Sequence, residues 1–307
     1  MGSGAWREDT FRSYAKKMNR TVGADGRIAG EMSNQEIFLA RNLDKMLDPA
    51  NVTRECCDSE EHPNTIPVIL ALDVTGSMGN AAVEVAKQLN VIMTQLYEKV
   101  KDVEFMIMGI GDFVYDRCPL QVSQFESDIR IAEQLDKVFF EFGGGGNKYE
   151  SYTAAWYFGA RHTRLDAWKR GKKGMIITMG DERINPYLPK EQLQNIIGDK
   201  LQGDVETKDL YAEVTEKYEL YHLNVRHGRD WDLAGIRRSW KEYLDEKHFR
   251  EVNLNSLTNE IIDIVTKEAE GGNENEEEAF LTDIGMKSAP AEPKKKALLP
   301  KLMGISW

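Results

Sequence analysis

The sequence predicts an α/β protein built on a doubly wound, mostly parallel sheet with helices on both faces. Apolar runs long enough for buried strands recur along the chain, and helical patterns of apolar residues separate them. The 307 residues are enough to bury one large core. Because strands that alternate with helices need crossover connections, we expect the sheet to be parallel.

The strand predicted at residues 66–72 (IPVILAL) is expected near the centre of this sheet. It is an uninterrupted apolar run bounded by turn residues, which is typical of a strand buried on both faces. A helix with one apolar face follows at 81–99, and a second buried strand (VEFMIMGIG) is predicted at 103–111. These three elements form the first strand-helix-strand unit.

The rest of the main domain continues the alternation. Further helices are expected at 128–137, 150–160, 191–197, 205–217 and 257–269, and further strands at 138–142, 172–180, 218–225 and 251–254. The glycine run at 143–146 is interpreted as a flexible turn. No Gly-Lys-Ser/Thr follows it, as a phosphate-binding loop would require.

The chain is predicted to divide into three regions. Residues 1–62 form an N-terminal extension with one helix at 33–47, which has a Ser or Asn cap, a Glu in its first turn and apolar residues at helical spacing. Residues 63–270 form the main domain. Residues 271–307 form a tail whose acidic and Pro/Lys-rich blocks favour disorder. Its apolar end, ALLPKLMGISW, makes docking onto the chain itself or onto a partner the alternative.

Composition excludes some classes of function. The net charge of -11 argues against nonspecific binding to nucleic acids, which needs a basic face. No apolar run is long enough to span a membrane. The three cysteines lack the spacing of a metal site, and their odd number favours a reducing, cytoplasmic location.

Oxygen-bearing side chains gather where the central strand ends. Asp73 closes the strand, and Thr75 and Ser77 follow at alternate positions before a helix begins. In parallel sheets, ligands sit beyond the carboxyl ends of the strands, and Mg²⁺ prefers oxygen ligands. The pattern therefore indicates a metal site. The alternative is that Asp73 or Ser77 only caps the following helix.

This stretch, DVTGSM, resembles the D-x-[ST]-x-S signature of von Willebrand factor A (VWA) domains. The strand before it and the helix after it also match the family, and the resemblance covers about residues 63–271. It implies the Rossmann-like VWA fold and a metal-ion-dependent adhesion site (MIDAS). Asp73, Thr75 and Ser77 would then hold Mg²⁺, Mn²⁺ or Ca²⁺. A prokaryotic or phage-type intracellular member is expected.

The resemblance implies two further ligands from other loops. Glu150, expected at the start of a helix, is similar to the metal-binding glutamate of integrin β domains; the alternative is an ordinary first-turn acid. Asp181 follows the strand at 172–180. Family members usually have an aspartate where this chain has Met179, so Asp181 is expected to compensate from two residues later.

A second cation site is also similar to one in integrin β domains. Asp112 and Asp116 follow the strand at 103–111, and with Asn147 and Glu150 they would form this neighbouring site or lie in the water shell of the first cation. The alternative is that the two aspartates are solvated or bind backbone amides.

The expected function is cation-dependent protein interaction, without enzymatic activity. An open coordination position on the metal would accept an Asp or Glu carboxylate from a partner protein. Family analogy names an AAA+ ATPase as a partner.

Two alternatives stay open. One is a Mg²⁺-dependent phosphohydrolase like the haloacid dehalogenases, with Asp73 as nucleophile and with Thr75, Lys172 or Lys173, and Asp181 in the other roles. Thr75, however, occupies the position where those enzymes place a general acid. The other is a structural subunit with a vestigial site, whose contact surfaces are the tail and the basic run 169–173 (KRGKK).

Overall fold

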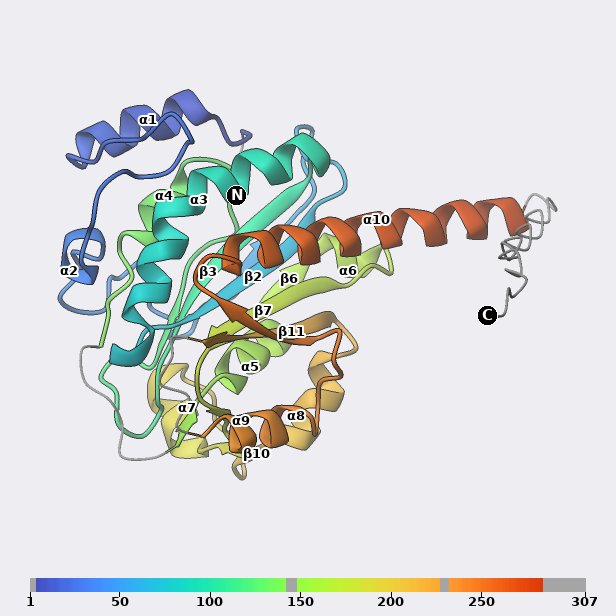
Figure 1. Cartoon of the computed structure of the whole chain (residues 1–307). Coiled ribbons are helices and arrows are strands. Elements are labelled where there is room, and N and C mark those ends of the chain that lie inside the picture. Colours follow the sequence, from blue (N-terminus) through green and yellow to red (C-terminus); the bar gives the residue numbers. More distant parts are fainter. Residues whose placement is uncertain (1–3, 142–147, 227–231, 284–307) are drawn as a thin grey trace, which may run out of the picture. The chain divides into compact units, whose positions relative to one another are not determined.

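The computed structural model describes residues 4–141, 148–226 and 232–283. Its main element is a six-stranded sheet in the order β12-β11-β7-β2-β3-β4 (Figure 1). Every neighbouring pair is parallel except β3 and β4. The predicted α/β class with a mostly parallel sheet is therefore confirmed.

The elements have the following bounds. The sheet strands are β2 (Ile66–Asp73), β3 (Val103–Ile110), β4 (Leu120–Val122), β7 (Gly174–Gly180), β11 (Tyr218–Arg226) and β12 (Phe249–Asn253). Shorter strands are β1 (Arg54–Cys56), β5 (Tyr149–Glu150), β6 (Thr163–Leu165), β8 (Arg183–Ile184), β9 (Tyr187–Leu188) and β10 (Val205–Glu206). The helices are α1 (Glu8–Lys17), α2 (Asn34–Ile37), η1 (Gly76–Met78), α3 (Gly79–Lys99), α4 (Arg130–Leu135), α5 (Thr153–Arg161), α6 (Asp166–Lys169), α7 (Lys190–Ile196), α8 (Thr207–Val214), α9 (Leu233–Trp240) and α10 (Leu257–Asp283).

Helices cover both faces of the sheet (Figure 1). The side chains of β2 are consequently buried on both faces. Val68, Leu70 and Leu72 pack with apolar residues of α1, α3, α4 and the first turns of α10. Ile69 and Ala71, which point the other way, pack with residues of α5, α7, α8 and α9. The uninterrupted apolar run is the consequence of this two-sided burial.

The helix predicted at 33–47 is wrong beyond its first turn. Ser33 and Glu36 form the expected cap contact, with Ser33 N donating to Glu36 Oε2 at 2.7 Å, but α2 ends at Ile37. Phe38 instead packs its ring on Phe140, with centroids 4.4 Å apart. The Asp44 side chain accepts a backbone N–H two residues on, which competes with helix formation.

The strand predicted at 138–142 is also wrong over its described residues, 138–141, which pair with no strand. The side chain of Gln121 takes the place of a partner strand: its Nε2 donates to Phe139 O, and its Oε1 accepts from Phe139 N, both at 2.8 Å. The sequence patterns also missed α1, α6, α9, β4 and the short strands. Two of those strands, β5 and β10, lie at the starts of segments that were predicted as helices.

The described residues divide after Ala269: residues 4–269 form one compact unit, and residues 270–283 belong to a second. The predicted division at residues 62 and 270 stays a prediction, and residues 284–307 of the tail lie outside the described part. Within the described residues, no helix combines the length and apolar character of a membrane span.

Candidate metal centre

The parallel sheet brings the predicted ligands to one edge. β2 ends at Asp73 and β7 at Gly180, and Leu72 is in register with Met179, so the loops after the two strands start side by side. Asp73 is buried, with 1% of its surface exposed, whereas Ser77 is exposed. The edge therefore has a buried carboxylate beneath an accessible hydroxyl.

Four of the predicted ligands form one chain of side-chain oxygens. Asp73 Oδ1 accepts from Thr75 Oγ1 at 2.6 Å and from Thr75 N at 2.9 Å. Thr75 Oγ1 lies 3.4 Å from Ser77 Oγ, which in turn donates to Asp181 Oδ1 at 3.0 Å. The structure thus brings Asp181, two residues beyond Met179, to the loop after β2.

Glu150 belongs to the same electrostatic cluster but not to the element predicted. It lies in β5, which pairs with β8, and α5 begins only at Thr153, so its expected place in the first turn of a helix is wrong. Glu150 is 6% exposed, and its Oε2 is buried without a hydrogen-bond partner. Burial, and next the charges of Asp73 and Asp116, raise its pKa well above the ordinary value.

The pKa of the Asp73 carboxyl is also raised above its ordinary value. Burial and then the negative charge of Asp181 raise its pKa, while hydrogen bonds from Thr75 and Tyr152 lower it. A buried carboxylate without a positive partner is costly, and a buried oxygen without a donor is rare. Both features fit a centre that binds a hard cation, for which carboxylate and hydroxyl oxygens are suitable ligands.

The residues predicted for a second cation bind backbone amides. Asp112 Oδ1 accepts from Val114 N at 2.6 Å and from Tyr115 N at 3.1 Å, and Asp116 Oδ2 accepts from Asp112 N at 2.7 Å. Burial raises the pKa of Asp116 to about 6. These contacts match the alternative interpretation of the two aspartates, and Asn147 lies outside the described residues.

Two residues of this edge were missed by sequence reasoning. Tyr152 is fully buried and donates from its hydroxyl to Asp73 Oδ2 at 2.8 Å. Glu182 has a buried Oε2 without a hydrogen-bond partner, and burial and the charge of Asp181 raise its pKa to about 7. Glu182 could have been proposed from the sequence, because it directly follows the predicted ligand Asp181. Tyr152 had none, because a tyrosine before a helix is usually a core residue.

Carboxylates alone do not define the centre. Among the described residues, no three His, Cys, Asp or Glu side chains gather closely enough to hold a metal ion. Asp73, Asp181 and Glu150 therefore do not converge on one point in this structure. The hydroxyls of Thr75 and Ser77 would be required as ligands, as the predicted set specifies.

The lysines considered for a phosphohydrolase lie at the other edge of the sheet. Lys172 and Lys173 precede β7, whereas Asp73 ends β2, which runs parallel to it. Lys173 also pairs with Glu219 at 2.9 Å. In the same basic run, Lys169 and Arg170 pair with Asp166 and Asp58 respectively.

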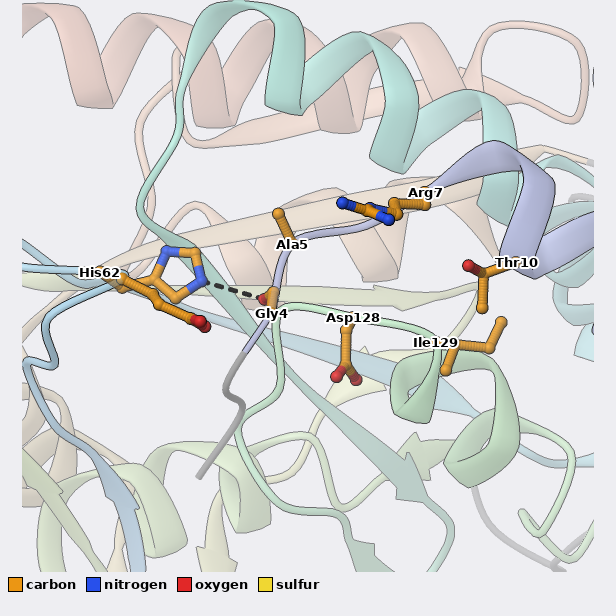
Figure 2. Close-up of a pocket in the computed structure, with 8 residues that line it drawn as sticks. Gly4, Ala5, Arg7, Thr10, His62, Asp128 and Ile129 are labelled. Atoms are coloured by element: carbon orange, nitrogen blue, oxygen red, sulfur yellow. Dashed lines mark hydrogen bonds between the residues drawn. The ribbon is translucent and has the colours of Figure 1, made fainter.

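A pocket of about 510 Å³ lies away from the candidate centre, between the N-terminal segment and the residues before α4 (Figure 2). Its charged lining has both signs, with Arg7 and Asp128 among its residues. His62 Nε2 lies 3.0 Å from Gly4 O, as Figure 2 shows, and its ring is buried. Because the pocket contains no predicted ligand, the carboxyl edge remains the candidate site.

The chain is thus an α/β protein with an acidic, hydroxyl-bearing loop cluster at the carboxyl edge of its sheet. No protein-family model matches it, and neither does any curated protein sequence.

Solved structures that match part of this chain include two bacterial proteins. The pilus adhesin SpaC from Lactobacillus rhamnosus GG, in an open conformation, matches with a TM-score of 0.46 and 14% identity, over 72% of this chain and 31% of the adhesin chain. The conserved hypothetical protein BatB from Bacteroides thetaiotaomicron matches with a TM-score of 0.40 and 16% identity, over 67% of this chain and 99% of that one.

A third match is proximal thread matrix protein 1 from the mussel byssus, with a TM-score of 0.42 and 11% identity over 69% of this chain and 49% of that chain. At these low values, none of the three matches bears on what this chain binds.

Proposed function

We propose that the protein is a VWA-type interaction module that binds a partner carboxylate through a divalent cation. Asp73, Thr75, Ser77 and Asp181 would hold the cation, and Glu150 would lie close to it. The observation that carries the proposal is the hydrogen-bonded chain of these four side chains, which joins the loop after β2 to the residue after β7.

The charges of the site support the binding of a cation. Burial raises the pKa values of both Glu150 and Asp73; the charges of Asp73 and Asp116 add to the rise for Glu150, and the charge of Asp181 adds to it for Asp73. Bound Mg²⁺ or Mn²⁺ would supply positive charge here and, where coordination stays open, would polarise an oxygen from a partner. Hydroxyl ligands are neutral, so they leave more of the cation's charge for that partner oxygen.

The surface beside the site supports a protein as the partner. Val114 and Tyr115 lie on the loop after β3 and are 60% and 56% exposed. Asp112 holds their backbone N–H groups, and Phe113 N donates to Ser151 Oγ at 3.0 Å, next to Glu150. A firmly held loop that presents two large apolar side chains is typical of interaction surfaces. An AAA+ ATPase as the partner rests on family analogy alone.

The phosphohydrolase alternative has less support. Thr75 occupies the place of a general acid, and its hydroxyl donates to Asp73, the expected nucleophile. Lys172 and Lys173 precede β7 at the edge opposite Asp73.

Calorimetric titration tests the cation. We expect Mg²⁺ or Mn²⁺ to bind the wild-type protein with one site, and Asp73→Asn to remove the binding heat. Asp199→Asn is a matched control, because Asp199 also accepts a tyrosine hydroxyl but lies away from the centre. Equal heats for wild type and Asp73→Asn would refute the metal site.

Fluorescence anisotropy tests the partner chemistry. Labelled peptides that carry one Asp or Glu beside an aromatic residue should bind in Mg²⁺ and be released by EDTA. The same peptides with Asn or Gln at that position should not bind. Binding that is unchanged by EDTA or by the amide substitution would contradict a metal-mediated contact.

A further inference from the structure

Tyr152 connects the two loops of the candidate centre. Its hydroxyl donates to Asp73 Oδ2 at 2.8 Å and accepts from Glu182 N at 3.3 Å. Asp73 Oδ1 is already held by Thr75, so both carboxylate oxygens of Asp73 have a donor from the protein. The orientation of this carboxylate is therefore fixed before any cation arrives.

Trp240 of α9 holds the same loop from its other side. Its Nε1 donates to Glu182 O at 3.2 Å, so the N–H and the C=O of Glu182 are bound by Tyr152 and Trp240 respectively. The preceding residue is Asp181, whose side chain accepts from Ser77. Fixing the backbone at Glu182 restricts where the Asp181 carboxylate can lie.

Close packing makes this arrangement rigid. A Cβ at Gly180 would lie 1.9 Å from the Tyr152 hydroxyl, so residue 180 must be glycine for the tyrosine to reach Asp73. The rings of Tyr152 and Trp240 have centroids 5.4 Å apart, and His222 stacks on Trp240 at 3.7 Å. All three rings are fully buried.

We propose that Tyr152 and Trp240 are positioning residues, an aromatic clamp that holds Asp73 and Asp181 in place for the cation. This inference rests on the proposed function. A ligand that is already oriented loses little freedom when the metal binds, and partners of metal ligands typically change metal affinity 10- to 100-fold. The clamp acts on Asp73 directly and on Asp181 through the backbone of Glu182.

Calorimetry with Mg²⁺ and Mn²⁺ on the full chain tests the clamp. Tyr152→Phe keeps the ring and removes only the hydroxyl, and we expect it to weaken metal binding by about tenfold. Trp240→Phe keeps an aromatic ring and removes the indole donor, so it should weaken binding to a smaller extent. In the control, Tyr157→Phe removes the hydroxyl of another tyrosine, which lies within α5 and donates to Asp199.

The melting temperature with and without Mg²⁺ separates positioning from simple loss of stability. We expect Tyr152→Phe and Tyr157→Phe to destabilise the metal-free protein to a similar extent, but only Tyr152→Phe to reduce the stabilisation by Mg²⁺. Wild-type affinity in both clamp variants would overturn the inference while leaving the metal site intact. Absence of Mg²⁺ binding to the wild type would overturn the proposed function and the clamp with it.

Discussion

Replacement of Asp73 by asparagine should stabilise the metal-free protein at pH 8 while removing its response to Mg²⁺. Burial and the charge of Asp181 raise the pKa of Asp73 to about 7. An acid whose pKa is raised in the folded state binds its proton more tightly there. The bound proton therefore stabilises the folded protein at low pH. This stabilisation is lost as the pH rises from the pKa of the unfolded state, about 4, through the pKa of the folded state.

The size of this effect follows from the pKa. A rise of about three pKa units corresponds to about 4 kcal/mol of lost stability once the pH is above 7. An asparagine avoids this penalty, but its amide fits the donor of Tyr152 less well, at a cost of about 1–2 kcal/mol. We therefore expect a net gain of about 2 kcal/mol, or about 4–8 °C in melting temperature.

Thermal denaturation in EDTA and in Mg²⁺, at pH 4.5 and pH 8, measures the effect. In EDTA the gain from Asp73→Asn should appear at pH 8 and nearly vanish at pH 4.5. In Mg²⁺ only the wild type should become more stable. A variant that is less stable than the wild type in EDTA at pH 8 would contradict the predicted cost of burying the Asp73 charge. A variant that responds to Mg²⁺ as the wild type does would contradict the role of Asp73 as a ligand.

Two further predictions concern packing and charge pairs within the fold. Gly180→Ala places a Cβ against the Tyr152 hydroxyl and should cost about 2–4 kcal/mol of unfolding free energy in urea denaturation. As the control, Gly203→Ala meets no atom within 4 Å and should change this free energy by less than about 1 kcal/mol. Equal effects of the two substitutions would contradict the close contact at Gly180. Arg20→Ala removes the positive partner of the buried Asp136 carboxylate and should cost about 3–5 kcal/mol. Arg164→Ala, which breaks an exposed ion pair with Glu55, should cost less than about 1 kcal/mol. A small effect at Arg20 would show that the N-terminal segment folds independently of the sheet.

The central strands could be predicted because their environment leaves a simple pattern. β2, β3 and β7 are buried on both faces, so nearly every position is apolar and the strand ends stand out. The site loop after β2 was found for the same reason, since Asp73 closes such a run.

Other features depend on contacts that a local pattern does not contain. Glu150 was expected in a helix because helix capping is a local rule, but β5 exists only through its two-residue pairing with β8. The helix expected at 33–47 stops where Phe38 turns to meet Phe140. Tyr152 contacts Asp73, 79 positions away in sequence, and no spacing rule links the two residues.

The most direct test of the central claim is an anomalous difference map from crystals of the protein grown with Mn²⁺. We expect a peak beside the side chains of Asp73, Ser77 and Asp181 that disappears in Asp73→Asn crystals. A map with no peak at this edge of the sheet, from crystals that hold Mn²⁺ elsewhere or nowhere, would contradict the proposed metal site.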